Sequence, residues 1–193
     1  DWSSDVCSSD LGGEVTGLEG SGLILQNNGT DDLEIFGNGP FIFTTPLADD
    51  SDYQVSVSTS PSNPSQECDV LFASGTLNGN HINNVLVSCF TLGYSIGGTV
   101  TGLAGEGLTL TNNGEVLLIK SNGSFTFNNT QSDETAYDVD ILIQPERPSQ
   151  SCSLTTDSGT ISGNDVNDIE VFCETQRLTV GGRSEEHTSE LQS

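Results

Sequence analysis

Residues 97–103 read Gly-Gly-Thr-Val-Thr-Gly-Leu, and this stretch decides the fold because the chain contains it more than once. Residues 12–18 read Gly-Gly-Glu-Val-Thr-Gly-Leu, 85 positions earlier, and residues 179–182 begin the phrase again, 84 positions later. Repeats of this length lie above the solenoid range, so each copy is predicted to be a small domain with its own core. The chain therefore divides into repeat 1 (residues 12–96), repeat 2 (residues 97–180) and the start of a third repeat (residues 181–182).

The two ends of the chain do not recur in the repeats. Residues 1–11 read DWSSDVCSSDL, and residues 183–193 read RSEEHTSELQS. A single DNA sequence can encode the first peptide on one strand and the second peptide, residue for residue, on the complementary strand. This DNA sequence resembles a common sequencing-library adapter. We therefore interpret both ends as non-native peptides and leave them out of the fold prediction.

The repeats themselves are strongly acidic. Residues 12–182 contain 22 acidic side chains and three basic ones, a net charge of −19, within a chain whose total is −24. Such a surface repels phosphate backbones and anionic lipid, so nucleic acid is excluded as a partner. No apolar run approaches the ~20 residues of a membrane-spanning helix, so this segment is not expected to insert into a membrane.

Four cysteines belong to the repeats: Cys68 and Cys89, then Cys152 and Cys173. Each pair is separated by 21 positions, and the pairs lie 84 positions apart. Four cysteines permit three connectivities, and the one that respects the repeat joins Cys68 to Cys89 and Cys152 to Cys173. A zinc site is disfavoured because the chain contains no C-x-x-C motif. Two disulfides within the repeats are therefore predicted, which implies an oxidising compartment.

Short alternating runs and turn residues indicate an all-β fold. The hairpin signal Asn-Gly follows the second run of each repeat and occurs again before the Phe-x-Phe run. Seven strands are expected in each repeat, packed as a two-sheet sandwich. In repeat 1 they centre on residues 14–18, 23–26, 33–35, 41–43, 53–57, 68–72 and 85–89, and each has a matching run in repeat 2.

The cysteines share the phase of the aliphatic residues in their strands. Cys68 alternates with Val70 and Phe72, and Cys89 with Val85 and Val87. The bridge is therefore expected inside the sandwich, where it joins either the last two strands or the two sheets. Closing a loop of this size stabilises the repeat by about 3 kcal/mol through the unfolded state.

The order of these motifs resembles a known family. G-G-x-V-x-G-L, L-x-L-x-N-N-G, N-G-x-F-x-F and Y-x-V-x-V together resemble prealbumin-like sandwich modules, which include carboxypeptidase regulatory-like and collagen-adhesin B-type domains. With the recurring phrase P-S-Q-x-C, the chain looks like tandem bacterial Ig-like repeats of large secreted or surface proteins. The resemblance implies a sandwich fold and an extracellular setting, but such modules host many activities.

The chain departs from collagen-adhesin B-type domains at one chemical position. The isopeptide cross-link of those domains requires a core lysine, whereas the only lysine here is Lys120, whose counterpart in repeat 1 is Phe36. Lys120 is out of phase with the inward Ile119, so it is predicted to lie on the surface. The disulfide is expected to replace the cross-link as the covalent staple.

Carboxylates offer the sharpest candidate for a ligand site. Asp49, Asp50 and Asp52, or Asp165 and Asp168, could supply hard oxygen ligands for calcium near the ends of the repeats. No D-x-D-x-D-G loop is present, and the acidic positions match only partly between the copies. A solvated acidic loop is therefore the preferred interpretation, and no metal site is predicted.

Catalytic chemistry is not indicated. The one histidine within the repeats, His81, is replaced by Asp165 in the second copy, so a nucleophile activated by histidine is not repeated. Three matches to the N-glycosylation pattern, at Asn28, Asn122 and Asn128, are interpreted as turn chemistry. No catalytic residue and no cofactor is predicted.

Together these features favour a non-enzymatic function. We expect a stalk, spacer or adhesin-like segment of a bacterial extracellular or cell-surface protein, whose partners are neighbouring repeats of the same chain and cell-surface or matrix components. The alternative is an accessory module of a secreted hydrolase that binds glycan or calcium.

Overall fold

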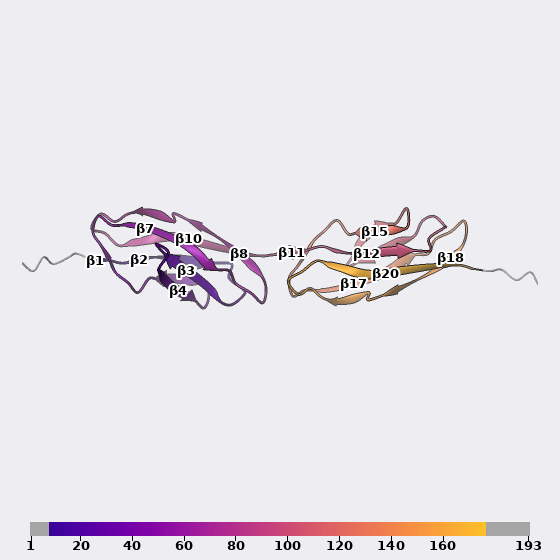
Figure 1. The fold of residues 1–193 in the computed structure, drawn as a ribbon, viewed down its shortest axis with the longest axis horizontal. Helices are drawn as coiled ribbons and strands as arrows, with labels where there is room; N and C mark the ends of the chain where they lie inside the picture. Colours follow the sequence, from indigo (N-terminus) through magenta and orange to yellow (C-terminus); the bar gives the residue numbers. More distant parts are fainter. Residues whose placement is uncertain (1–7, 177–193) are drawn as a thin grey trace, which may run out of the picture.

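The structure, a computed structural model, describes residues 8–176. These residues form strands and no helix, so they contain no helix that could cross a membrane. The two repeats lie end to end along the longest axis of the molecule (Figure 1). The predicted third repeat, residues 183–193 and residues 1–7 lie outside the described residues, so the prediction that both terminal peptides are non-native stays a prediction.

Twenty strands make up the two repeats. Those of repeat 1 are β1 (Ser8–Ser9), β2 (Leu11–Thr16), β3 (Leu23–Asn27), β4 (Asp31–Ile35), β5 (Gly39–Ile42), β6 (Leu47–Ala48), β7 (Asp52–Thr59), β8 (Gln66–Leu71), β9 (Ser74–Thr76) and β10 (Ile82–Thr91). Those of repeat 2 are β11 (Gly93–Tyr94), β12 (Ile96–Thr101), β13 (Thr109–Asn112), β14 (Glu115–Leu118), β15 (Gly123–Thr126), β16 (Gln131–Ser132), β17 (Ala136–Ile143), β18 (Gln150–Thr155), β19 (Ser158–Thr160) and β20 (Val166–Thr175).

Each repeat is a sandwich of two four-stranded sheets, with the same strand order in both copies. One sheet has the order β5-β2-β10-β8 in repeat 1 and β15-β12-β20-β18 in repeat 2. The first and last long strands of each repeat are parallel neighbours in this sheet, and the other pairs are antiparallel. A two-stranded ladder, β1-β6 or β11-β16, lies at the start of each repeat. The predicted all-β sandwich in two tandem copies is confirmed.

The second sheet contains a strand beyond the seven that the sequence predicted. Its order is β4-β3-β7-β9 in repeat 1 and β14-β13-β17-β19 in repeat 2. The additional strands, β9 and β19, read Ser-Gly-Thr and are exposed along their whole length, so they carry no apolar alternation. The ring of Tyr53 packs directly on Gly75 of β9, where a Cβ would lie only 2.9 Å from the ring, so this position requires glycine.

Each repeat has its own hydrophobic core, as expected from the repeat length. The two cores contain equivalent side chains from both sheets, and each includes an edge-to-face phenylalanine pair. The ring centroids lie 6.0 Å apart for Phe41 and Phe43, and 6.1 Å apart for Phe125 and Phe127. Because the cores are separate, a change inside one repeat is expected to act on that repeat alone.

The glycine pair that opens each repeat is required by close strand packing. A Cβ on Gly98 would lie 1.8 Å from the carbonyl oxygen of Ile169 in β20, and one on Gly97 would lie 2.3 Å from the carbonyl oxygen of Phe125 in β15. Gly13 and Gly12 have the same surroundings in repeat 1. The two glycines therefore allow β12 to pack closely between β15 and β20, and β2 between β5 and β10.

The two Asn-Gly turns differ in kind. At the first, Asn28 and Gly29 have positive φ values of 51° and 72° in the three-residue loop that joins β3 to β4. Repeat 2, which is one residue shorter here, closes the same hairpin with the two residues Asn113 and Gly114, at φ values of 46° and 91°. At the second, β4 and β5 belong to different sheets, so the chain crosses the sandwich instead of closing a hairpin. The side chain of Asn38 serves this crossing, because it accepts a hydrogen bond from Leu18 N and donates one to Leu18 O.

Both repeats as folded begin before the predicted boundaries at residues 12 and 97, since β1 and β11 precede these positions and Ile96 belongs to the core of repeat 2. Leu11 lies in β2, is fully buried, and occupies the position of Ile96 in repeat 2. Its carbonyl oxygen accepts a hydrogen bond from Phe43 N, as that of Ile96 does from Phe127 N. Leu11 therefore completes the core, whatever the origin of residues 1–11, which stays a prediction.

Candidate functional site at the junction of the repeats

The two disulfides join the last two long strands of each repeat within one sheet. Cys68 of β8 and Cys89 of β10 are direct partners in the antiparallel ladder, with Cα atoms 4.0 Å apart. Cys152 and Cys173 have the same relation in repeat 2, also at 4.0 Å. Cys68 is half-buried and the other three are buried. Of the two arrangements left open by the sequence, the structure selects the link between strands and not the link between sheets.

Removing one bridge should destabilise one repeat. We expect the double variant Cys152→Ala and Cys173→Ala to lower the free energy of unfolding of repeat 2 by about 3 kcal/mol, because the unfolded chain gains the entropy of an open 21-residue loop. Urea unfolding followed by NMR signals assigned to each repeat measures this loss. The transition of repeat 1 serves as the internal control, and an unchanged repeat 2 transition would contradict the staple role.

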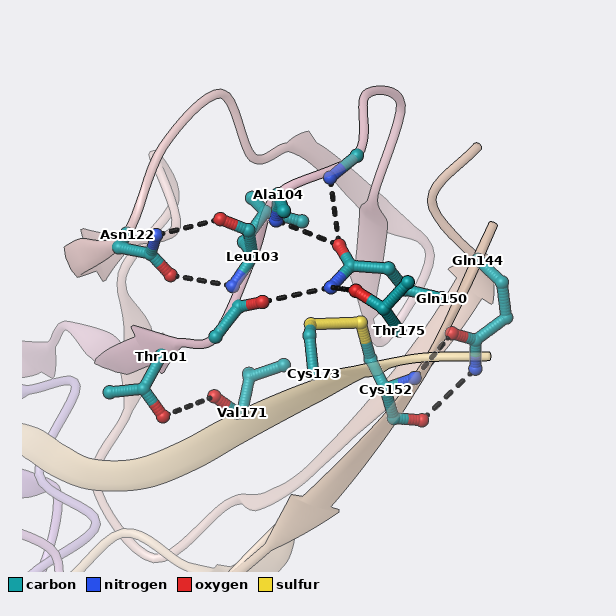
Figure 2. Close-up of a disulfide and its surroundings, with 12 residues drawn as sticks. Thr101, Leu103, Ala104, Asn122, Gln144, Gln150, Cys152, Val171, Cys173 and Thr175 are labelled. Carbon is teal, nitrogen blue, oxygen red and sulfur yellow. Dashed lines mark hydrogen bonds between the residues drawn. A yellow bond between two sulfur atoms is a disulfide. The ribbon is translucent and has the colours of Figure 1, made fainter. Parts of the chain in front are cut away.

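A buried glutamine lies next to each bridge (Figure 2). The side-chain oxygen of Gln150 accepts hydrogen bonds from Ala104 N and Gly105 N, both at 2.8 Å. Its amide nitrogen donates to Gly102 O at 2.8 Å and to Thr175 Oγ1 at 3.3 Å. All four hydrogen-bonding positions of one side chain are thus used, and the loop after β12 is tied to the start of β18.

The same network occurs in repeat 1. Gln66 accepts from Glu19 N and Gly20 N, and donates to Gly17 O and Thr91 Oγ1. The glutamine belongs to the recurring Pro-Ser-Gln phrase, which the sequence interpretation used only as a marker of the fold. Its role could have been suspected from that recurrence, because a polar residue kept between two copies of a sandwich is often a buried hydrogen-bonding group.

Asp133 connects the two repeats. It follows β16 in repeat 2 and is 6% exposed. Its carboxylate accepts a hydrogen bond from Ser65 N of repeat 1 at 2.7 Å and one from Gly163 N of repeat 2 at 2.7 Å. Its backbone N–H donates to Leu92 O at 3.0 Å, and Leu92 N donates to Ser65 O at 2.8 Å. The carboxylate of this one residue therefore joins the loop before β8 to the loop before β20, and its backbone N–H bonds to the connection between the repeats.

Hydrogen bonds to backbone N–H groups stabilise the charged form of this carboxylate. The Ser65 N–H lowers the pKa of Asp133 most, burial opposes the shift, and the Gly163 N–H lowers the pKa further. The equivalent residue in repeat 1, Asp49, is exposed, although its carboxylate also lies beside a glycine, Gly79. The difference in burial shows that repeat 1 covers Asp133 in the assembled pair.

The acidic residues considered for calcium serve other local roles. Asp165 accepts a hydrogen bond from Ser95 N at 2.8 Å, which lowers its pKa. The Asp52 carboxylate accepts a hydrogen bond from the Thr76 hydroxyl. Burial raises the pKa of Tyr137, and the negative charge of Asp168 raises it further. Within residues 8–176, no three histidine, cysteine or acidic side chains are grouped as metal ligands would be. Neither the set Asp49, Asp50 and Asp52 nor the set Asp165 and Asp168 is therefore part of such a group.

His81 and Lys120 are both exposed. The Nδ1 atom of His81 accepts a hydrogen bond from Asp10 N at 2.9 Å, at the place where Asp165 accepts from Ser95 N in repeat 2. His81 is thus a loop-capping residue in this structure. Lys120 follows the buried Ile119 and points away from the core, as predicted, so it is not placed for a core cross-link.

The three asparagines of the glycosylation pattern all donate structural hydrogen bonds. The amide nitrogen of Asn28 donates to Asp52 O, that of Asn122 to Leu103 O, and that of Asn128 to the Glu115 carboxylate. The Glu115 carboxylate also accepts from the backbone N–H groups of Asn128 and Asn129. These bonds agree with the interpretation of the three motifs as turn chemistry.

The arrangement defines the chain as a pair of disulfide-bonded β-sandwich repeats with a shared polar junction. No family model and no curated protein matches the chain. Among solved structures, it is similar to the major pilin protein T-13 of Streptococcus pyogenes, with 11% sequence identity and a TM-score of 0.25. The match covers 88% of this chain and 97% of that chain. At such values no functional property is transferred from that protein.

Proposed function

We propose that this chain is a non-enzymatic spacer or stalk segment of a bacterial extracellular or cell-surface protein. The observation that carries the proposal is the junction at Asp133, which bonds to both repeats and is buried between them. A spacer has to hold its modules in a defined relative position. A buried, charged, twice-bonded carboxylate provides such a restraint, because tilting one repeat away would leave N–H groups and a charge without partners.

Two further observations support the setting. One disulfide in each repeat fits an oxidising compartment and therefore an exported protein. His81, the one histidine among the described residues, is exposed and caps a loop, which favours a structural protein over a hydrolytic enzyme. The adhesin-like role and the cell-surface or matrix partners stay part of the proposal, and binding to a glycan array would instead favour the accessory-module alternative.

Replacing Asp133 with alanine should loosen the junction while both repeats stay folded. The variant loses the bonds from Ser65 N and Gly163 N, so the distribution of distances between spin labels on the two repeats is expected to broaden. Lowering the pH should have the same effect on the native chain. Because the pKa of Asp133 is lower in the folded state, its stabilisation is full above the unfolded value of about 3.9 and is lost as the pH falls through the lowered value.

The matched control is Asp49→Ala, which removes the equivalent carboxylate from repeat 1, where no second repeat of the described chain covers it. This variant should leave the distance distribution unchanged at neutral pH. A distribution in Asp133→Ala as narrow as that of the native chain would overturn the proposal that this residue fixes the spacing.

A further inference from the structure

Strands β4 and β14 are equivalent edge strands whose outward side chains differ between the repeats. Each pairs with a single neighbour and forms one end of its sheet, so its other side has no partner strand within the described residues. In repeat 1 the outward residues along β4 and just after it are Asp32, Glu34 and Phe36. The same positions in repeat 2 hold Val116, Leu118 and Lys120.

Both sets are exposed, including their apolar members. Phe36 is 88% exposed, Val116 54% and Leu118 52%. Surface phenylalanine exposed to this degree contributes nothing to the core of its own repeat, and exposed apolar side chains on an edge favour association. The two copies therefore differ in charge and polarity at this edge, although the buried framework is the same in both.

A groove beside β14 extends the exposed apolar surface of repeat 2. It has a volume of about 800 Å³, and its lining includes Leu118 and Ile143 together with two basic residues, Lys120 and Arg147, and two acidic ones, Glu106 and Glu146. Lys120 and Arg147 are the only basic residues other than histidine in the range 8–176, and neither forms an ion pair with a side chain of that range. In a chain of net charge −24, the pairing of exposed aliphatic side chains with the unpaired Lys120 along β14 complements the acidic and aromatic side chains along β4.

We propose that β4 of one copy of this chain pairs antiparallel with β14 of a second copy. This register places Asp32 opposite Lys120, Glu34 opposite Leu118 and Phe36 opposite Val116. Opposite charges then meet at one end of the pair and two apolar side chains at the other, and Glu34 lies diagonal to Lys120. The two sheets become continuous across the contact, which is the usual way in which an exposed edge is completed.

The charges disfavour the pairing of two β4 strands. Side by side, these strands would place Asp32 and Glu34 of one copy against the same carboxylates of the other, which is unfavourable. Each copy carries both a β4 and a β14 strand, so one kind of chain supplies both sides of the contact. The inference concerns lateral association of chains and goes beyond the proposed spacer function, which depends on Asp133.

Sedimentation equilibrium of the intact chain at about 0.15 M salt, up to about 1 mM, tests the proposal. We expect reversible self-association under these conditions, because salt screens the general repulsion between two chains of net charge −24. Phe36→Ser, Asp32→Lys and Lys120→Glu should each raise the dissociation constant about tenfold, and the doubly exchanged chain, with Asp32→Lys and Lys120→Glu, should regain most of the native affinity.

Asp69→Lys is the matched control, since Asp69 is exposed in repeat 1 and its replacement changes the net charge by the same amount as Asp32→Lys. Thermal unfolding confirms that every variant is folded, which is expected for exposed positions. A chain that is monomeric at all concentrations would overturn the inference. It would equally be overturned if Asp69→Lys weakened association as much as Asp32→Lys, or if the exchanged pair stayed as weak as the single variants.

Discussion

Gly98→Ala is expected to unfold repeat 2 and to leave repeat 1 intact. The added Cβ would lie 1.8 Å from the carbonyl oxygen of Ile169, well inside contact distance, and the obstacle is backbone rather than a movable side chain. Strands β12 and β20 would have to separate, and their parallel ladder lies at the centre of a four-stranded sheet. Overpacking typically costs about 1–3 kcal/mol, and a clash with backbone should reach or exceed the upper end of that range, out of the roughly 4–13 kcal/mol available to a domain of this size.

NMR spectra of the intact chain measure this outcome repeat by repeat. Gly98→Ala should remove the dispersed signals of repeat 2, and Gly13→Ala should remove those of repeat 1, because a Cβ on Gly13 meets Val85 O at the same 1.8 Å. The control is Gly37→Ala, since nothing lies within 4 Å of a Cβ at this position and repeat 2 already has Ser121 there. Native-like spectra and melting temperature for Gly98→Ala would show that the strands can move apart at little cost.

Much of the fold could be predicted from sequence because it is encoded locally and twice. The alternation around Tyr53, Val55 and Val57 and the turn at Asn28-Gly29 depend on neighbours within a few residues. The cysteine pairing followed from the repeat itself, since the other connectivities would cross between copies. The duplication also made each local prediction more reliable, because a pattern that occurs in both repeats reflects the shared fold.

Other features were missed because they depend on distant backbone. Strand β9 has no apolar residue, so only its pairing with β7 makes it a strand. Asp133 looked like one acid among many in a loop, and its partners Ser65 and Gly163 lie 68 and 30 positions away. A carboxylate acquires such a role from the folded positions of N–H groups, which no side-chain pattern reveals.

The sequence was also silent on why glycine opens each repeat. The predicted first strand began after the glycines, at residues 14 and 99, whereas β2 and β12 contain them, and glycine weakens a strand unless something requires it. The requirement comes from β15 and β20, which are distant in sequence and approach from both sides. Conserved framework between two copies can therefore reflect close backbone packing as well as turns.

Gln150→Leu is the second large expected effect, a loss of about 4 kcal/mol from the stability of repeat 2. Leucine fills a similar volume but leaves four hydrogen-bonding groups without a partner: the N–H groups of Ala104 and Gly105, the carbonyl of Gly102 and the hydroxyl of Thr175. Each lost bond at a partly buried site costs about 1 kcal/mol. The effect should exceed that of removing the neighbouring disulfide, because the bridge acts through the unfolded chain, whereas the glutamine holds the folded loop in place.

Urea unfolding of Gln150→Leu, followed on signals assigned to each repeat, measures the loss. Gln66→Leu should reproduce it in repeat 1, where the same four bonds are present, and Gln54→Leu, at an exposed position of β7, should change stability by less than about 0.5 kcal/mol. Amide hydrogen exchange at Ala104 and Gly105 separates local from global effects. If their exchange is as slow in Gln150→Leu as in the native chain, the loop does not depend on the glutamine, and the recurrence of Pro-Ser-Gln needs another cause.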